Sequence, residues 1–277
     1  MRLRLLTWTR VAALVAGSAL VAWTWTTASA QQPAARTYRA PRAPDGHPNL
    51  NGIWQAMNTA HWDVEAHSAG PSAVRDLGAA GAIPAGLGVV EGGEIPYKPD
   101  ALAKKKENFA NRLKLDPEIK CYLPGVPRAV YMPFPCQIIQ GKEHVMMVHE
   151  FAGAVRTVYM ENHTEAPADS WMGWSNGRWE GESLVIDTRG FNDLSWFDRA
   201  GNFHSEALHV VERFTARSAD TLLYEATIED PNVFTRPWKI SMPLYRRVEA
   251  NAQILEFRCV EFAEDLMYGH LRKQPSK

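Results

Sequence analysis

The feature that most constrains the fold is a run of short apolar segments separated by tight turns, extending from residue 137 to residue 262. Turn signals such as Gly141-Lys142, Ala152-Gly153-Ala154 and Glu180-Gly181-Glu182 separate these segments. The pattern predicts about eight or nine antiparallel strands, each paired with its neighbour in sequence. Sequential hairpins favour a mainly β fold, an antiparallel up-and-down β-barrel or curled meander, because closure removes exposed sheet edges. A β-sandwich is the alternative.

The alternation of side chains along the predicted strands indicates which faces are buried. Along 207–215, the carboxylate of Glu212 falls on the same face as Phe214, whereas His209 and Arg213 fall on the opposite face. Either Glu212 is a carboxylate on an otherwise apolar face, or the opposite, polar face lines a cavity. Both alternatives make this strand a place to look for function.

The first 30 residues have the organisation of a cleavable signal peptide. Arg2, Arg4 and Arg10 precede an uncharged apolar run, and the small residues Ala28 and Ala30 predict cleavage after Ala30. A retained membrane anchor is the alternative, but the run is near the lower length limit for spanning a bilayer. The sequence therefore predicts a periplasmic or secreted protein with no membrane span after cleavage.

The rest of the chain divides by composition. Residues 31–48 are rich in Pro and Arg and predict an extended tether, followed by a single β-rich domain at 49–277. A predicted helix begins with Asp100 as its N-cap and places Leu102 and Phe109 on one side. The regions of the domain are, in order, an irregular loop or lid at 60–99, this one short helix at 100–115, a Pro-rich strap at 116–136 that inserts apolar groups into the core, and the antiparallel strands at 137–262.

Three cysteines lie outside the predicted leader: Cys121, Cys136 and Cys259. Export permits a disulfide, and three pairings are possible, each of which leaves one thiol over. Cys121 with Cys136 is the preferred pair because it closes a short, Pro-rich loop. Cys259 belongs to an apolar strand pattern, which is typical of a small buried hydrophobe.

Charge and motifs argue against several function classes. The formal net charge is −1, and the predicted leader contributes three arginines but no acid, so the remaining chain lacks the basic footprint of a nucleic-acid-binding protein. No glycine-rich phosphate loop occurs, so we expect no nucleotide cofactor. Gly173 to Gly177 matches Gly-x-Ser-x-Gly, but a hairpin follows it where a serine nucleophile elbow requires a helix.

The histidines form no ready metal motif. His144 and His149 are five residues apart, as are His204 and His209, and on a strand this spacing places the two side chains on opposite faces. A metal assembled across strands stays open, but the sequence by itself predicts no metal ligand.

Several sequence blocks resemble a large, uncharacterised family of exported bacterial proteins. These blocks are Trp171-Met-Gly-x-Ser-x-Gly-x-Trp-Glu-Gly, Leu184-Val-Ile-Asp-Thr, Gly190-Phe-Asn-Asp, His204-Ser-Glu-x-Leu-His-Val-Val-Glu-Arg-Phe and Ile228-Glu-Asp-Pro followed by Pro237-Trp238. The resemblance covers most of the chain after Asp45 and implies no particular activity. Gly52-Ile53-Trp54 is similar to the start of the first strand in lipocalin-like (calycin) β-barrels, which implies that Trp54 plugs one barrel end.

The candidate site centres on the stretch from Trp171 to Phe214, which combines aromatic surface with titratable groups. Loops at a barrel mouth are where such groups contact a ligand. A histidine beside a carboxylate and tryptophans can move a proton near neutral pH. The acid–base candidates are His204, His209, Asp193 and Glu212, and the ligand-binding candidates are Trp171, Trp174, Asn192, Trp196, Arg213 and Arg156.

The function that these residues favour is binding of a small apolar or aromatic molecule by an exported β-barrel, without a cofactor. A cofactor-independent lyase, isomerase or hydrolase that uses His, Asp and Glu as acids and bases is the first alternative. A cell-envelope interaction module, whose Pro-rich segments contact a partner, is the second. No reaction-specific motif distinguishes an enzyme from a binding protein here.

Overall fold

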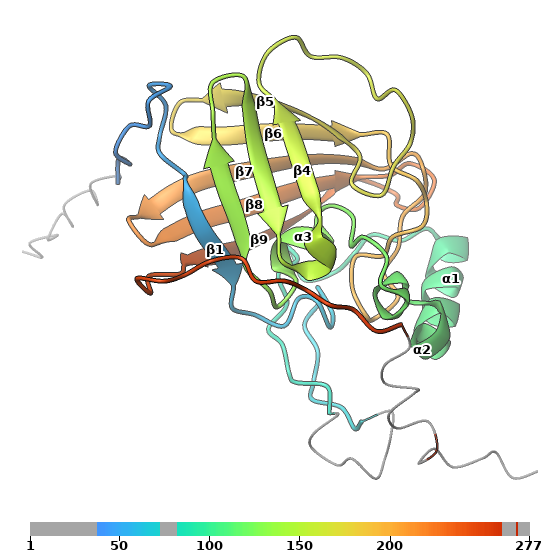
Figure 1. Cartoon of the computed structure of the whole chain (residues 1–277). Helices are drawn as coiled ribbons and strands as arrows, with labels where there is room; N and C mark the ends of the chain where they lie inside the picture. The colour runs from blue at the N-terminus through green and yellow to red at the C-terminus, as the bar shows by residue number, and fades with distance from the viewer. Residues whose placement is uncertain (1–37, 73–81, 262–269, 271–277) are drawn as a thin grey trace, which may run out of the picture. The chain divides into compact units, whose positions relative to one another are not determined.

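The computed structural model describes residues 38–72, 82–261 and 270, and its strands form one closed barrel (Figure 1). The strands follow one another around the barrel in sequence order: β1 Gly52–Ala56, β2 Cys136–Gln140, β3 His144–His149, β4 Val155–Tyr159, β5 Trp174–Glu180, β6 Ser183–Arg189, β7 His209–Ser218, β8 Thr221–Glu229 and β9 Trp238–Arg246. The predicted mainly β barrel is confirmed. The predicted leader and residues 31–37 of the predicted tether lie outside the described residues.

The barrel closes between its first and last strands. β1 pairs with β2 on one side and with β9 on the other, both antiparallel. The strand predicted at the C-terminal end of the chain is therefore wrong for the described part of 253–262, which contains no strand. Because β9 is already paired with β1 and β8, no sheet edge remains for it. This segment instead crosses the barrel as an extended strap, red in Figure 1.

One strand pair departs from the predicted antiparallel pattern. β4 and β5 are parallel, and their register covers only two pairs, Val158 with Ser175 and Tyr159 with Asn176. Parallel neighbours require a long crossover, which residues 160–173 supply as a loop that extends beyond the barrel (Figure 1). The sheet is consequently least continuous at this pair of strands.

Trp54 of β1 and Arg246 of β9 are paired where the first and last strands of the barrel meet. The Trp54 ring is buried, its indole nitrogen donates to the Leu50 carbonyl at 2.9 Å, and the Arg246 guanidinium lies 4.1 Å above the ring centroid. A Cβ on Gly52 would lie 2.0 Å from Nη1 of Arg246, and the φ of Gly52 is +145°. Glycine is therefore favoured two residues before this tryptophan, because L residues rarely adopt this φ and a side chain would displace the arginine.

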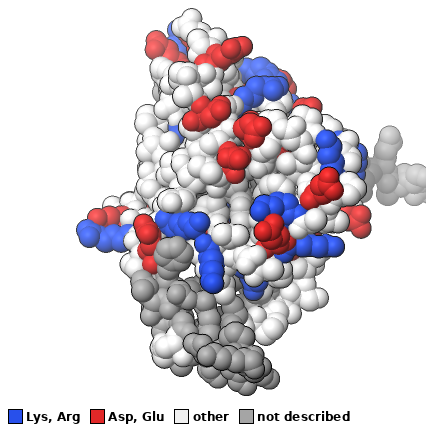
Figure 2. Space-filling view, turned by 90° about the vertical axis from the view of Figure 1, so that its right-hand side faces the viewer, with Lys and Arg blue, Asp and Glu red and all other residues white. Residues whose placement is uncertain are grey.

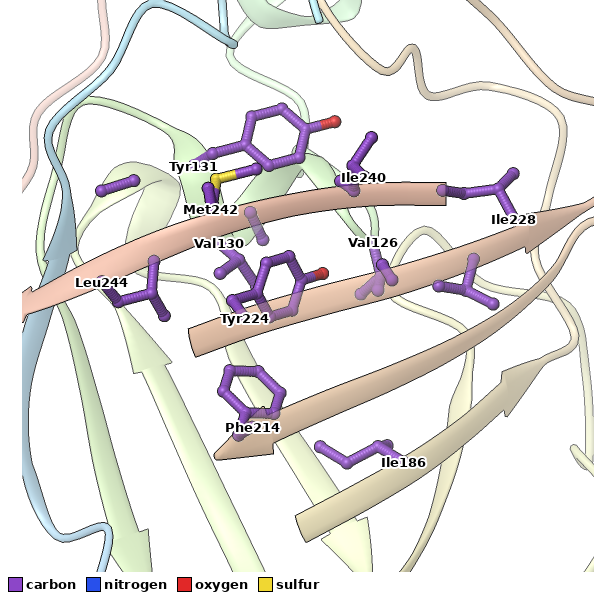
Figure 3. Close-up of a cluster of buried hydrophobic side chains, with 14 of the residues drawn as sticks. Val126, Val130, Tyr131, Ile186, Phe214, Tyr224, Ile228, Ile240, Met242 and Leu244 are labelled. Carbon is purple, nitrogen blue, oxygen red and sulfur yellow. The ribbon is translucent and has the colours of Figure 1, made fainter. Parts of the chain in front are cut away.

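The strap at 116–136 packs into the barrel core. Its short helix α3 (Arg128–Tyr131) is entirely buried, and Val126, Val130 and Tyr131 pack against Tyr224 and other inward side chains of the strands (Figure 3). The predicted insertion of apolar groups is confirmed, and the strap also contains the single helical turn of α3. Prolines flank the single turn of α3 rather than interrupting it.

The predicted helix at 100–115 is broken in two. α1 spans Pro99–Ala110 and α2 spans Arg112–Leu115, with Lys98 as the N-cap residue of α1 in place of the predicted Asp100. Pro99 explains this shift, because proline is favoured in the first helical turn. The predicted apolar face is also wrong, since Leu102 and Phe109 are exposed.

Two further helical turns and the irregular region complete the described fold. The 3₁₀ turns are η2, Pro117–Lys120, and η3, Phe151–Gly153. Between residues 60 and 99, the described part contains isolated bridges, His67 with Gly86 and Gly70 with Ile83, but no strand. This agrees with the irregular segment predicted there.

The disulfide joins Cys121 to Cys259, whereas the sequence favoured Cys121 with Cys136. Cys136 is a free, buried thiol on β2 that faces the barrel interior. The C-terminal strap brings Cys259 back to the end of η2 across 138 residues of sequence. Loop length alone could not identify this pair, because the return of the strap is a tertiary feature.

Candidate functional site

A pocket of about 410 Å³ opens on the barrel wall beside β4 and the segment that enters β5. Its lining residues are mostly apolar or aromatic and come from β4, the β4–β5 loop, the first residue of β5 and the strap. They are Leu123, Val155, Arg156, Thr157, Tyr159, Pro167, Ala168, Ser170, Trp171, Met172, Gly173 and Trp174. Three of the predicted ligand-binding residues, Arg156, Trp171 and Trp174, are thus brought together.

The pocket exists because β4 and β5 separate at this end. Pairing between them is confined to Val158–Tyr159 on β4 and Ser175–Asn176 on β5. The chain turns into β5 at Gly173, whose φ is +65° and whose Cβ would lie 2.8 Å from the Phe191 ring. This turn holds the segment before β5 apart from the beginning of β4.

Aromatic rings form the walls of the pocket. The rings of Tyr159 and Trp174 stack with their centroids 4.5 Å apart and an interplanar angle of 19°. Trp171 contacts Tyr122 of the strap, with centroids 5.0 Å apart. The indole nitrogen of Trp174 is buried and has no hydrogen-bond partner among the described residues. The walls are therefore mainly flat and apolar, because this nitrogen is not accessible from the pocket.

Arg156 belongs to the pocket wall, but its guanidinium turns into the barrel. Nε donates to Oγ of Ser175 at 2.8 Å, and Nη2 donates to Oγ1 of Thr188 at 2.7 Å and to the carboxylate of Glu212. The side chains of Arg156 and Glu212 are 2% and 0% exposed. Their charges neutralise each other in a site that water does not reach.

Glu212 has a second partner in the barrel core. The Tyr224 hydroxyl donates to Oε1 of Glu212 at 2.9 Å. Burial and the Glu212 charge raise the pKa of this hydroxyl well above its usual value. Glu212 is therefore the carboxylate on an apolar face that the alternation indicated, and its contacts are those of a structural ion pair.

His204 is buried in the loop after β6, apart from the residues that line the pocket. Its Nε2 lies 2.8 Å from Oγ of Ser195, and its Nδ1 lies 2.9 Å from the Ser205 carbonyl oxygen. Nδ1 therefore carries the proton and Nε2 accepts from the Ser195 hydroxyl. Burial lowers the pKa of His204, so the imidazole is neutral near pH 7. The relative exposures of Ser195 and His204 are both 2%.

The other loop candidates do not converge on His204. Trp196 is buried, and the Asn192 side chain accepts a hydrogen bond from the Leu194 backbone at 3.3 Å. Asp193 is exposed. Neither Asn192 nor Asp193 has a side-chain contact with Ser195 or His204 among the described hydrogen bonds.

His209 and Arg213 lie on the outer face of β7, so they do not line the barrel as the sequence reading allowed. His209 Nε2 contacts Oδ2 of Asp187 at 3.0 Å, and Arg213 Nη2 donates to Oε2 of Glu180 at 2.5 Å. Period-two alternation places both residues opposite Glu212. Their ion pairs are on the barrel surface, away from the pocket.

Sequence reasoning missed Tyr159, Ser175 and Thr188. Ser175 and Thr188 face inward on the paired strands β5 and β6 and complete the contacts of Arg156. Alternation along β6 gives a signal for Thr188, since its neighbours on that face are Leu184 and Ile186. Tyr159 carries no comparable signal, because its stacking on Trp174 depends on the parallel β4–β5 pair.

The chain matches no protein-family model and no curated protein in the comparisons made. In the described part of the chain, no group of three or more His, Cys, Asp or Glu side chains is placed to hold a metal ion. None of the described helices has the length and apolar character needed to cross a membrane.

Proposed function

We propose that the protein binds a small apolar or aromatic molecule in the pocket beside β4 and β5. The stacked rings of Tyr159 and Trp174, together with Trp171, carry this proposal, because they present flat apolar surface to the pocket. Its volume of about 410 Å³ is within the range of small-molecule sites, roughly 300–1,000 Å³.

The ligand site is on the barrel flank, not in the barrel lumen. Inward side chains such as Phe214, Tyr224 and Met242 pack together and fill the interior (Figure 3). A ligand carried inside the barrel would have to displace this core. The pocket requires no such displacement, which supports the flank over the lumen as the place of binding.

Surface charge offers a ligand no strong electrostatic attraction on the face drawn in Figure 2. Lys and Arg side chains lie among Asp and Glu side chains there, without a large patch of one sign. Export also remains part of the proposal. The disulfide between Cys121 and Cys259 supports it, because such bonds persist mainly in oxidising compartments.

Fluorescence titration with N-phenyl-1-naphthylamine tests the proposal. We expect the probe to brighten on binding, and Trp174→Ala to weaken its affinity about tenfold through the lost stacking surface. Trp179→Ala is the matched control, since Trp179 is also on β5 but stacks on His47. Binding that is equally weakened in both variants, or absent from the parent protein, would contradict the proposal.

The alternative as a hydrolase has one supporting observation, the 2.8 Å contact between Ser195 and His204. A neutral histidine that accepts from a serine hydroxyl is the arrangement of an activated nucleophile. However, the 2% exposure of both residues gives a substrate no route to the hydroxyl in this conformation. We therefore favour binding.

A further inference from the structure

The edge of β4 that faces β5 is unpaired along its first half. The β4–β5 register begins at Val158, so residues 155–157 of β4 have no counterpart on β5. In the antiparallel β3–β4 ladder, the amide of Met160 donates to the Glu143 carbonyl, and alternate residues bond the same way. The main-chain groups of the odd-numbered residues Val155 and Thr157 therefore face the gap where β4 and β5 separate.

Three main-chain groups in this gap have no hydrogen-bond partner among the described residues. They are the N–H and C=O of Val155 and the N–H of Thr157. Alternation excludes them from the β3 ladder, the register excludes them from the β5 ladder, and no loop hydrogen bond uses them. Both residues line the pocket, and Val155 is 52% exposed. A ligand in the pocket is therefore beside an open strand edge.

β4 has no lysine, proline or bulge of the kind that commonly protects a strand edge from pairing. Its sequence is VRTVY, and its register with β3 is regular. Arg156 is the only described lining residue with a charged side chain, and Glu212 neutralises it inside the barrel. A charged segment would lose its hydration without gaining an ion pair here, so the pocket and its edge favour an uncharged one.

We propose that the open edge of β4 binds an extended, uncharged peptide segment of a partner protein, which pairs with Val155 and Thr157 as an added strand and places an apolar side chain in the pocket. An added strand supplies the partners that the three open main-chain groups lack, while the pocket selects the side chain. The open edge is only about 7 Å long, at the usual rise of a strand, so a short segment covers it.

This inference goes beyond the proposed function, because the strand edge carries it and the aromatic rings do not. Both ligands would share the pocket beside β4. Because the peptide would use main-chain groups that an aromatic molecule does not need, the two proposals can be tested separately.

Isothermal titration calorimetry with the peptide acetyl-Ser-Thr-Phe-Thr-Ser-amide tests the inference, together with versions in which one main-chain nitrogen at a time is methylated. One peptide N–H should meet the Val155 carbonyl. We expect methylation of that nitrogen to weaken binding about tenfold or more, since it removes the donor and obstructs the approach to β4. Methylation of either neighbouring nitrogen, which points away from β4, should weaken binding less than about threefold.

Thr157→Pro removes one open N–H of the protein, at an edge position where proline is tolerated. Thr157→Val is the reference variant, because valine keeps the N–H. We expect Thr157→Pro to bind the peptide about tenfold more weakly than Thr157→Val, with the circular dichroism spectra of both variants matching that of the parent protein. If Thr157→Pro does not fold, the methylation series alone decides.

The outcomes separate this inference from the proposed function. If the peptide does not bind, or if methylation of every nitrogen has the same effect, the inference fails, while binding of N-phenyl-1-naphthylamine leaves the proposed function intact. Position-dependent methylation effects without naphthylamine binding would support the inference and contradict the proposed function. A dimer in sedimentation equilibrium that the peptide does not dissociate would overturn the inference, because a second copy would then occupy the edge.

Discussion

The guanidinium of Arg156 and the carboxylate of Glu212 form an ion pair inside the barrel, between β4 and β7. Ser175, Thr188 and Tyr224 supply further hydrogen bonds to the two groups. Taking two charges out of water is costly, and these contacts offset the cost only while all of them are present. The pair therefore links the wall of the pocket to the stability of the barrel.

Glu212→Gln should lower the free energy of unfolding by about 3–5 kcal/mol, because it leaves the Arg156 charge buried without its counterion. Urea denaturation followed by tryptophan fluorescence measures the change. The double variant Arg156→Met/Glu212→Leu is the control, since it removes both charges, and we expect it to recover most of the loss. A single variant that costs less than about 1 kcal/mol would show that the pair is not buried as described.

Gly52→Ala should destabilise the barrel near Trp54 by about 1–3 kcal/mol, because alanine rarely adopts a φ of +145° and its Cβ would displace the Arg246 guanidinium from Trp54 and the Asn51 carbonyl. Gly46→Ala is the matched control: its φ is also positive, but nothing lies within 4 Å of the added carbon. Thermal unfolding of both variants measures the two losses, and we expect the loss at Gly52 to be the larger. Equal losses in the two variants would contradict a special requirement for glycine at position 52.

Cys259→Ser should lower the free energy of unfolding by about 2–5 kcal/mol, since the disulfide closes a long loop of the unfolded chain. Peptide mapping of the non-reduced protein should recover the peptide that joins Cys121 to Cys259. Cys136→Ala is the control, because its thiol is free, and its disulfide peptide should be unchanged. Recovery of a peptide that joins Cys121 to Cys136 would overturn the pairing.

The pH dependence of stability should report on His149. Burial and the Arg156 charge lower the pKa of this imidazole to about 3, whereas an unfolded histidine titrates near pH 6.5, roughly. Above pH 6.5, approximately the pKa in the unfolded chain, neutral His149 causes no loss of stability. As the pH falls from about 6.5 towards 3, only the unfolded chain takes up the proton, so the folded state loses stability. His149→Gln should therefore reduce the slope of unfolding free energy against pH between about 6 and 5 by up to about 1.4 kcal/mol per unit.

Asp198 gives the unfolding free energy a pH dependence of the opposite sign, so the slope of His149→Gln is compared with the slope of the parent protein. Burial and the Asp63 charge raise the pKa of Asp198 to about 7, so protonation of this carboxyl stabilises the fold over an overlapping window. Equal slopes for His149→Gln and the parent would contradict a buried, neutral His149.

Local sequence patterns predicted the barrel because side-chain alternation and turn residues depend on interactions between residues that are close in sequence. Period-two alternation placed Glu212 and His209 on opposite faces of one strand but left open which face was inside, and Gly-x-Trp marked the beginning of β1. The parts of the fold that the sequence did not predict depend on contacts between residues far apart in the chain. No local pattern predicts that β4 and β5 are parallel. This parallel pairing places the Tyr159 ring against the Trp174 ring. The pocket that Trp171 and Trp174 line is on the barrel flank, whereas the sequence pointed to a loop at the barrel mouth.

The most direct test of ligand binding beside β4 and β5 is the ¹H–¹⁵N spectrum of the tryptophan indoles during titration with 2-acetylnaphthalene. Trp→Phe variants assign the cross-peaks. We predict that the Trp174 and Trp171 indole signals shift with added ligand, because these residues line the pocket, while the Trp54 signal, bonded to the Leu50 carbonyl at the barrel end, stays in place. A titration that moves Trp54 and leaves Trp174 unchanged would contradict the proposed site.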